Sequence, residues 1–360
     1  MYREEVVIVR KIIFEDDDIQ LLETSGGAGR AILYRTFFSK VQEQEEIVVN
    51  VTATELKLGT GGWDIVKAIP QAHPHKELKT DGHIMKARYM PNQHSVLSVE
   101  AQESEDHSLF HTPFSLRGKR VLLAELHSML PLVYSLIRCF SASMKITVII
   151  SDEAALPLKL SEHMRILSKQ DQFHSITVGQ AFGGEFEAVN LITALQYADQ
   201  KLKSDIILIT LGPGVVGTGT FYGFSGMELA NWANIVGSLE GQPVWVPRVS
   251  FADERERHYG ISHHTLTPLQ KFTWSKSVVP LPLLSISHQA KTLEEQAKSI
   301  QQQHCIKWVE PKSFQEELAG ALKWYPKEIK TMGRTFEDDP AFFYTVAAAV
   351  FTAINQKRED

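Results

Sequence analysis

After residue 116 the chain alternates between apolar runs and amphipathic stretches. Continuous apolar runs, typical of strands buried on both faces of a parallel sheet, occupy residues 120–124, 146–150, 175–178, 205–211 and 244–249. Helical periodicity follows the first four, over residues 128–140, 158–168, 185–203 and 227–239. This alternation predicts an α/β fold in which helices cover both faces of a mostly parallel, Rossmann-like sheet.

The pattern continues less regularly to the end of the chain. Helices are predicted near residues 267–274, 291–303, 313–324 and 340–354. Strands are predicted at residues 278–284 and 305–309. Pro340 directly after Asp339 is a typical start signal for the last helix.

The first hundred residues have a different, β-like pattern. Their apolar or alternating runs are separated by acidic or glycine turns such as EDDD and SGGAG, and cover residues 6–14, 19–22, 30–37, 47–53, 83–89 and 96–101. Such spacing predicts a small β-barrel or sandwich. Residues 102–117 are polar and unpatterned, as linkers are. We therefore predict an all-β domain over residues 1–115 and the α/β domain over residues 116–360.

Composition and charge exclude several classes of protein. With 43% hydrophobic and 22% charged residues, the chain is neither disordered nor fibrous. Its N-terminus does not resemble a signal peptide, and no apolar run reaches the roughly 18 residues of a membrane span, so we predict a cytoplasmic protein without a membrane partner. Acidic residues outnumber basic ones in residues 1–115. This excess repels phosphate backbones and disfavours nucleic-acid binding.

A glycine-rich loop follows the apolar run DIILITL. Residues 212–226 contain six glycines, which make the loop costly to order and favour a ligand or close packing as compensation. Its amides and threonine hydroxyls offer a cradle for an anion. The candidate ligand-binding residues here are Gly212, Gly214, Gly217, Thr218, Gly219 and Thr220.

This loop matches no standard phosphate-binding motif in full. Gly212, Gly214 and Gly217 satisfy G-x-G-x-x-G, but no helix begins within the motif and no acidic residue ends the next strand. The lysine of a P-loop is missing, and GFSGM lacks the second glycine of a nucleophile elbow. The sequence therefore identifies no cofactor.

Polar side chains also follow other strands of the predicted sheet. Ligands bind beyond the carboxyl ends of the strands in such sheets, and loops after consecutive strands are usually neighbours, so we expect residues 248–264 to touch the glycine loop. Our candidates for proton transfer are Asp253, His258 and His263. The candidates for contact with an anionic ligand are Arg248, Arg255, Arg257, His127 and Asp152. We assign no metal ligands and predict no structural metal, because no standard set of four nitrogen and sulfur ligands is assembled; a loosely held catalytic metal on Asp253, His258 and His263 stays open as an alternative.

Each candidate also has a purely structural explanation. Asp152 is a suitable helix N-cap, and the charges of DERERH can pair with one another in solvent. His263 and His264 are adjacent, so we expect at most one of them to face a site. The glycines can serve backbone conformation or packing alone.

Several phrases of the chain are distinctive, among them GHIMKARYMPNQ, TVGQAFGGEFEAVNL, GPGVVGTGTFYGFSG and SFADERERHYGISHHTLT. From about residue 45 onward the chain resembles an uncharacterised family, mainly of Gram-positive bacteria, whose members share a domain of unknown function. The resemblance implies a bacterial, cytoplasmic protein and assigns no activity, cofactor or catalytic residue. The family phrase usually reads like MKLRYTP where this chain has MKARYMP, so no site is placed on Lys86 or Arg88.

Two classes of function remain open. The first is an enzyme that acts on a small anionic substrate, phosphorylated and nucleotide-like molecules among them, bound at the loop from Gly212 to Thr220. The second is a non-catalytic ligand sensor or protein-interaction module that uses the same crevice. The expected partners are a small anionic ligand and, in a homodimer, a second copy of the chain.

Overall fold

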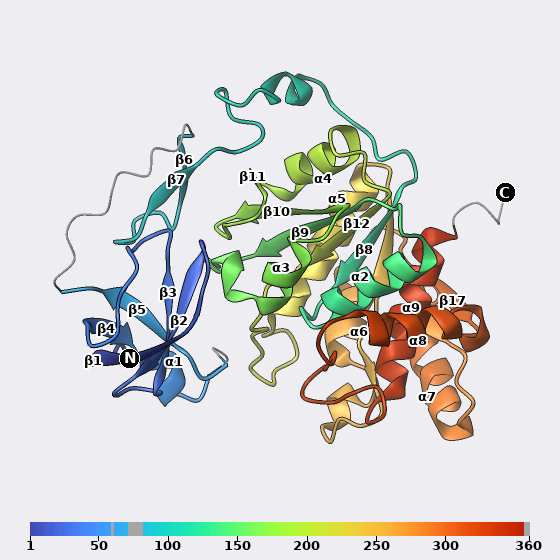
Figure 1. Ribbon diagram of the computed structural model, residues 1–360. Coiled ribbons are helices and arrows are strands. Elements are labelled where there is room, and N and C mark those ends of the chain that lie inside the picture. The colour runs from blue at the N-terminus through green and yellow to red at the C-terminus, as the bar shows by residue number, and fades with distance from the viewer. Residues whose placement is uncertain (59–60, 71–81, 356–360) are drawn as a thin grey trace. The chain divides into compact units, whose positions relative to one another are not determined.

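The computed structural model describes residues 1–58, 61–70 and 82–355 (Figure 1). The chain forms two compact units. The first comprises Met1–Thr80 and Tyr89–Asn92, and the second comprises Asp81–Arg88 and Gln93–Asp360.

The first unit is a small closed β-barrel, as its sequence pattern predicts. Its strands are arranged in the order β1-β2-β3-β5-β4. Alternate residues of β1 point inward, so that Val7 and Val9 are buried while Val6 is exposed. The short helix α1 (Thr52–Glu55) begins where we had expected a strand to continue. The strands are β1 (Glu4–Glu15), β2 (Ile19–Thr24), β3 (Arg30–Tyr34), β4 (Glu46–Asn50) and β5 (Asp64–Ala68).

The second unit is built on an eight-stranded, all-parallel sheet with the order β11-β10-β9-β12-β8-β13-β16-β17. Its central strands consist mainly of buried apolar residues because both of their faces are covered. The predicted Rossmann-like parallel sheet is thus confirmed. The strands are β8 (Arg120–Ala124), β9 (Ile146–Asp152), β10 (Phe173–Gly179), β11 (Phe186–Ala188), β12 (Ile206–Thr210), β13 (Gln242–Val246), β16 (Val278–Pro282) and β17 (Cys305–Val309).

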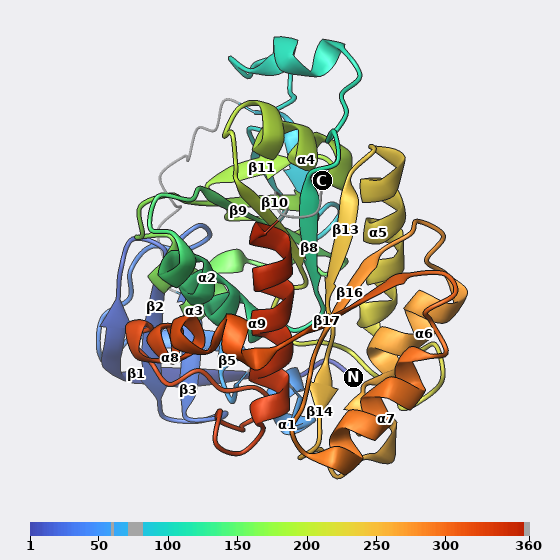
Figure 2. The ribbon, with the colours of Figure 1, turned by 90° about the vertical axis from the view of Figure 1, so that its right-hand side faces the viewer.

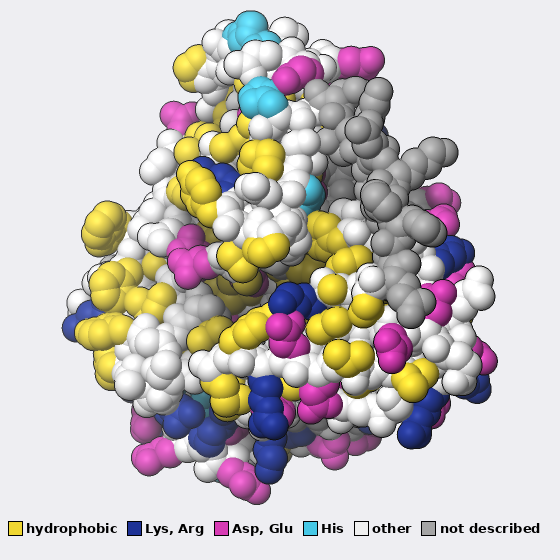
Figure 3. Space-filling view, turned by 90° about the vertical axis from the view of Figure 1, so that its left-hand side faces the viewer, with side chains coloured by type: hydrophobic (Ala, Val, Ile, Leu, Met, Phe, Trp, Pro, Cys, Tyr) yellow, Lys and Arg dark blue, Asp and Glu magenta, His cyan; other side chains and the backbone are white. Residues whose placement is uncertain are grey.

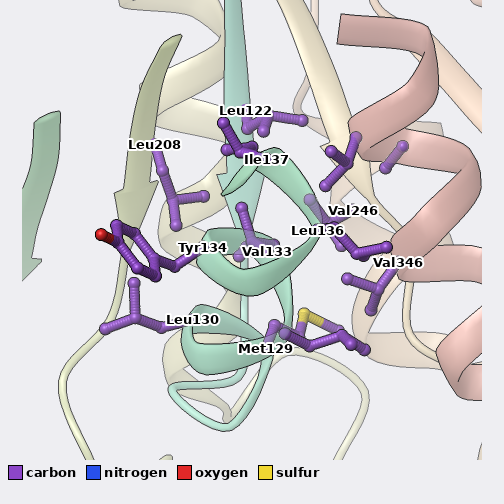
Figure 4. Packing of buried hydrophobic residues seen from close by; sticks show 14 of the residues in the cluster. Leu122, Met129, Leu130, Val133, Tyr134, Leu136, Ile137, Leu208, Val246 and Val346 are labelled. Carbon is purple, nitrogen blue, oxygen red and sulfur yellow. The ribbon is translucent and has the colours of Figure 1, made fainter. Parts of the chain in front are cut away.

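Helices cover both faces of this sheet (Figure 2). Leu122 and Ala124 of β8 pack on the first face, whereas Val121 and Leu123 pack on the second. The first face is covered by α2 (Met129–Phe140), α3 (Glu162–Leu167), α8 (Gln315–Trp324) and α9 (Pro340–Ile354). The second face is covered by α4 (Leu191–Gln200), α5 (Glu228–Ser238) and α6 (His263–Lys271). Figure 4 shows side chains of α2 beside Leu208 of β12 and Val346 of α9.

The strand order creates the place where a ligand can bind. Strand β12 lies between β8 and β9, although both precede it in the chain. The chain leaves β8 and β9 toward helices on the first face, and leaves β12 toward α5 on the second face. Neighbouring connections that diverge in this way open a crevice beyond the carboxyl ends of the strands.

Several short elements escaped the sequence patterns. Residues 186–188 form the edge strand β11 instead of the start of a helix, and α4 begins at Leu191, after the N-cap Asn190. Helix α6 begins at His263, four residues before the predicted start, directly after a hairpin of β14 (Val249–Ser250) and β15 (Gly260–Ile261). Strands of two or three residues are too short to produce a periodic signal. The remaining helix and hairpin are α7 (Ser287–Ala297) and the pair β6 (Ile84–Lys86) and β7 (His94–Val96).

The polar segment of residues 102–117 packs on α4 of the second unit. Asp106 Oδ2 accepts a hydrogen bond from the Tyr197 hydroxyl at 2.9 Å, and Gln196 Nε2 donates to the Leu109 carbonyl at 2.8 Å. Phe110 and Phe114 pack against the core of the second face. The second compact unit therefore includes chain that precedes the sequence-based division at residue 115.

Two observations concern the surface. None of the helices in the described ranges combines the length and apolarity needed to cross a membrane. On the face of the molecule shown in Figure 3, Lys and Arg side chains lie among Asp and Glu side chains. The described part of that face therefore presents charges of mixed sign.

Candidate functional site

A cavity of about 420 Å³ lies beyond the carboxyl ends of β9 and β12. Its described lining comes from residues 152–156 and 211–228 and includes three carboxylates, Asp152, Glu153 and Glu228, but no Lys, Arg or His. Burial raises the pKa of the Glu228 carboxyl, and the charge of Glu153 adds to this effect. An anion is therefore disfavoured inside this cavity.

The glycine loop is anchored at its start by Asp152. One carboxylate oxygen of Asp152 accepts the Gly212 N–H at 2.9 Å, and the other accepts the Ala154 N–H at 2.9 Å. A Cβ atom at Gly212 would lie only 2.1 Å from Leu156 Cδ2, so this glycine is needed for close packing. Gly214 has a φ of 95°, a conformation that L-residues with a side chain rarely adopt. The first part of the loop thus has structural reasons for its glycines.

The threonine hydroxyls of the loop hydrogen-bond within the loop. Thr218 Oγ1 and Thr220 Oγ1 lie 2.9 Å apart, and Thr218 Oγ1 also donates to the Gly223 carbonyl at 2.9 Å. The Gly223 N–H donates to Thr220 Oγ1 at 3.1 Å. Gly219 lies between the two threonines with a φ of 75°. These hydroxyls stabilise the turn, which accounts for them without a ligand.

Three histidines, His258, His263 and His264, lie together on the other side of the loop, and we call them the histidine cluster. Their ring centres are 5.2 Å (His258–His263), 4.9 Å (His258–His264) and 4.4 Å (His263–His264) apart. Ser262 positions two of them, since its Oγ caps α6 by accepting the His264 N–H and lies 2.7 Å from His258 Nδ1.

We expected at most one of His263 and His264 to face a site, and the structure brings both rings into the cluster. Both rings lie in the cluster because they occupy the first turn of α6, and His258 from the preceding short helix lies within about 5 Å of each.

The histidine cluster touches the glycine loop. The Phe224 ring stacks on the His264 ring with centres 3.9 Å apart, and a Cβ atom at Gly217 would lie 3.6 Å from His264 Cε1. The expected meeting of the loop with residues 248–264 is therefore observed, but not for the expected reason. Strands β12 and β13 are not neighbours, since β8 lies between them, and the loop reaches His264 across the end of β8.

The end of β8 contributes Glu125, which is buried against the cluster. Glu125 Oε1 lies 2.6 Å from His264 Nδ1, and a Cβ atom at Gly226 would lie 3.2 Å from the Glu125 side chain. The sequence placed Glu125 and His264 among the polar residues that follow strands, but we assigned neither of them a catalytic or binding role. The only signals for them were the position of Glu125 directly after a buried strand and the paired histidines after Ser262.

Arginines and carboxylates surround the cluster. Asp253 accepts two hydrogen bonds from Arg255, at 2.9 and 2.8 Å, which hold the pKa of its carboxyl well below the usual range. The buried Arg248 lies 3.5 Å from Asp253 Oδ2 and 3.8 Å from Glu125 Oε1. Its Nη2 makes no hydrogen bond with the described residues. Arg255 and Arg257 are exposed at the edge of this group.

Burial also affects the imidazoles of the cluster. It lowers the pKa of His258 to about 3, with the positive charge of Arg248 adding to the effect. It lowers the pKa of His263 to about 4, with the neighbouring His264 as the next contribution. Both rings are therefore neutral near pH 7 and keep a lone pair on one nitrogen.

His127 lies at the start of the glycine loop, where both of its ring nitrogens contact other residues of the protein. Its Nδ1 is 3.3 Å from the Leu211 carbonyl and its Nε2 is 2.6 Å from Ser161 Oγ, the N-cap of α3. Burial lowers the pKa of this imidazole to about 4. His127 thus connects the end of β8, the start of the glycine loop and α3.

Residues 30–350 match a family model described as a protein of unknown function, DUF3866. The chain belongs to this family. The DUF3866 match includes the glycine loop, Glu125 and the whole histidine cluster. No curated protein matches the chain at a significant level. Membership of DUF3866 brings no activity with it, so a functional assignment depends on the site itself.

Proposed function

We propose that the protein is an enzyme that acts on a small anionic substrate at the histidine cluster, with His264 as the group that moves a proton. The contact between the Glu125 carboxylate and His264 Nδ1, at 2.6 Å, carries this proposal. A buried carboxylate on one ring nitrogen fixes the tautomer and orientation of an imidazole and leaves Nε2 available for a substrate. Glu125 is only 1% exposed, so water does not compete for this bond.

Arginines on the same side of the loop favour an anion there. Arg248 has a buried Nη2 without a hydrogen bond, and Arg257 is exposed beside the cluster. His263 is the only half-buried member of the cluster, which marks the side from which a ligand can approach. A guanidinium that is already desolvated binds an anion strongly because little solvation is lost on binding. The anionic group of the substrate therefore belongs beside the histidines, and not in the carboxylate-lined cavity.

The sequence-based candidates take different parts in this proposal. Asp253, held ionised by Arg255, orders the arginines and does not carry a proton. Gly217 keeps the approach to His264 open, since a methyl group there would lie 3.8 Å from Nε2. Asp152 and Gly212 fix the start of the loop. In this proposal the main contribution of the loop is to leave space for a substrate beside His264, and not to supply a series of hydrogen-bond donors.

The test is turnover by the full-length protein on panels of phosphate monoesters, nucleotides and carboxylates, followed by mass spectrometry of the products. His264→Gln should lower kcat on a converted substrate by about 10²–10⁴-fold, the usual contribution of a general acid or base. Glu125→Gln and Gly217→Ala should lower it less. His288→Gln, at an exposed position on α7, is the control and should leave turnover unchanged.

Two outcomes would contradict the proposal. Turnover that survives both His264→Gln and Glu125→Gln would place the chemistry elsewhere. Saturable binding of an anion without conversion of any panel member would favour the sensor, which needs donors but no proton-transfer group.

A further inference from the structure

We infer that the histidine cluster binds one divalent transition-metal ion through one ring nitrogen from each of His258, His263 and His264. As a statement about an enzyme, this inference rests on the proposed function, because the ion would occupy the same site; with Nε2 on the ion and Nδ1 on Glu125, His264 would hold the ion and a metal-bound water would take over the proton transfer. As a statement about binding, it stands on geometry alone. The spacing H-x₄-H-H matches none of the usual zinc motifs.

The distances in the cluster suit a shared ion. Among the described residues, these three histidines offer nitrogens that all lie within 4.8 Å of one another. With metal–nitrogen bonds of about 2.1 Å, three imidazoles around one ion keep their ring centres about 4.5–5.2 Å apart. The observed range of 4.4–5.2 Å agrees with this value. Even if all three nitrogens lay 4.8 Å apart, each would need to move by only about 0.7 Å toward a central ion to reach bonding distance.

The remaining ring nitrogens are held as they are in metal sites. His258 Nδ1 bonds to Ser262 Oγ at 2.7 Å and His264 Nδ1 bonds to Glu125 Oε1 at 2.6 Å, so both rings keep Nε2 for an ion. Metal-binding histidines almost always direct their second nitrogen to such a carboxylate or hydroxyl partner, which fixes the tautomer and raises the basicity of the ligand.

His263 supplies a separate observation. Its Nε2 is buried and has no hydrogen-bond partner among the described residues. An unpaired buried nitrogen costs about 1–3 kcal/mol, and most such groups in proteins are satisfied. A structural histidine triad would leave this cost unexplained, whereas a metal–nitrogen bond accounts for it.

The donor set selects the class of metal. Three neutral imidazoles suit Zn²⁺, Co²⁺, Ni²⁺ or Cu²⁺, whereas Mg²⁺ and Ca²⁺ require oxygen ligands. The buried carboxylate of Glu125 offsets part of the charge of the ion, and Asp253 offsets that of the nearby arginines. Three protein ligands also leave a position open for water or a substrate oxygen, the arrangement of catalytic zinc sites.

The experiment titrates the full-length, tag-free, chelator-treated protein with Co²⁺ and then with Zn²⁺. We expect one equivalent of Co²⁺ to produce the visible absorption of a low-symmetry site, and Zn²⁺ to displace it. Glu125→Gln should weaken binding by about 10–100-fold, the effect of losing an outer-sphere partner. His263→Ala, which removes a ligand, should weaken it by more than about 100-fold. His288→Ala should leave the affinity unchanged.

His263 is the best position for this test because its ring is half-buried and its Nε2 makes no hydrogen bond. If His263→Ala fails to fold, His263→Gln keeps most of the side-chain volume and answers the same question. Absence of saturable binding, equal affinity in His263→Ala, or a preference for Mg²⁺ would overturn the inference. Loss of turnover in His264→Gln without any metal binding would refute the metal site and leave the proposed function intact. Stoichiometric metal binding without turnover of any substrate would support the metal site and contradict the proposed function.

Discussion

Replacement of Lys86 by Met should destabilise the second unit strongly. The Lys86 side chain is completely buried, and its Nζ donates to the carbonyls of Gly179 and Ala181, both at 2.9 Å. It also lies 3.1 Å from Glu187 Oε2. This ion pair joins the β6–β7 hairpin to the end of β10 and to β11. The sequence pattern placed Lys86 on a half-buried strand and gave no sign of its partner.

The size of the effect follows from what the substitution leaves behind. Lys86→Met keeps the length of the side chain but leaves two carbonyl oxygens and one carboxylate buried without the ammonium group that they contact. Removal of one partner from a buried ion pair costs about 3–5 kcal/mol, which corresponds to a fall of about 6–20 °C in Tm for a unit of this size. The exposed Lys201, ion-paired with Asp106, is the matched control, and Lys201→Met should cost less than about 1 kcal/mol.

The effect should also depend on pH. Burial raises the pKa of the Glu187 carboxyl, against the lowering effect of Lys86. Without Lys86 this pKa rises further, so protonation of Glu187 relieves the buried charge at low pH and the relief is lost as the pH rises through the folded-state pKa. Urea unfolding should therefore show a smaller loss at pH 5 than at pH 8.

A double variant completes the test. In Lys86→Met/Glu187→Gln the amide oxygen can still accept the Gly183 N–H, which now donates to Glu187 Oε1 at 2.7 Å, and no buried charge remains. The double variant should thus be more stable than Lys86→Met alone. The reasoning is refuted if Lys86→Met costs less than about 1 kcal/mol or if its effect does not change with pH.

Two further predictions concern the loop and its base. Because burial lowers the pKa of His127 to about 4, its neutral form supports the fold above pH 6.5, and this contribution of about 3 kcal/mol is lost as the pH falls toward 4. Chemical denaturation of His127→Gln should show a correspondingly weaker pH dependence, and an unchanged profile would contradict the assignment. Gly214→Ala should lower the free energy of unfolding by about 1–3 kcal/mol, because φ is 95° at this position. Gly217→Ala should change Tm little, because the nearest atom to its new methyl group, His264 Cε1, lies 3.6 Å away. Equal losses of stability in the two variants would show that both glycines serve packing alone.

The sequence predicted the elements of the sheet far better than the contacts of the site. The runs VLLA in β8 and IILI in β12 are apolar because both sheet faces are covered, and that signal is local. The Glu125–His264 bond joins residues 139 positions apart. No local pattern encodes it, because it depends on β8 lying between β12 and β13.

The same limit applies to the charges. Three arginines and three histidines between residues 248 and 264 suggested an anion site, but the sequence could not show that Arg255 is committed to Asp253. Nor could it show that the cavity beside the glycine loop is lined by carboxylates, since these come from two separate segments, the end of β9 and the start of α5. Pairing between charges is decided by the tertiary structure.

The insertion of β12 between β8 and β9 has a consequence for how the protein is made. During synthesis β8 and β9 emerge first, yet each lacks its neighbour until residues 206–210 have left the ribosome, and β8 waits for β13 as well. Until then the edges of β8 and β9 that pair with β12 stay unpaired, which exposes them to pairing with other chains and slows folding. Glu125 can meet His264 only after residue 264 has been synthesised, so the proposed site forms when most of the chain has been translated.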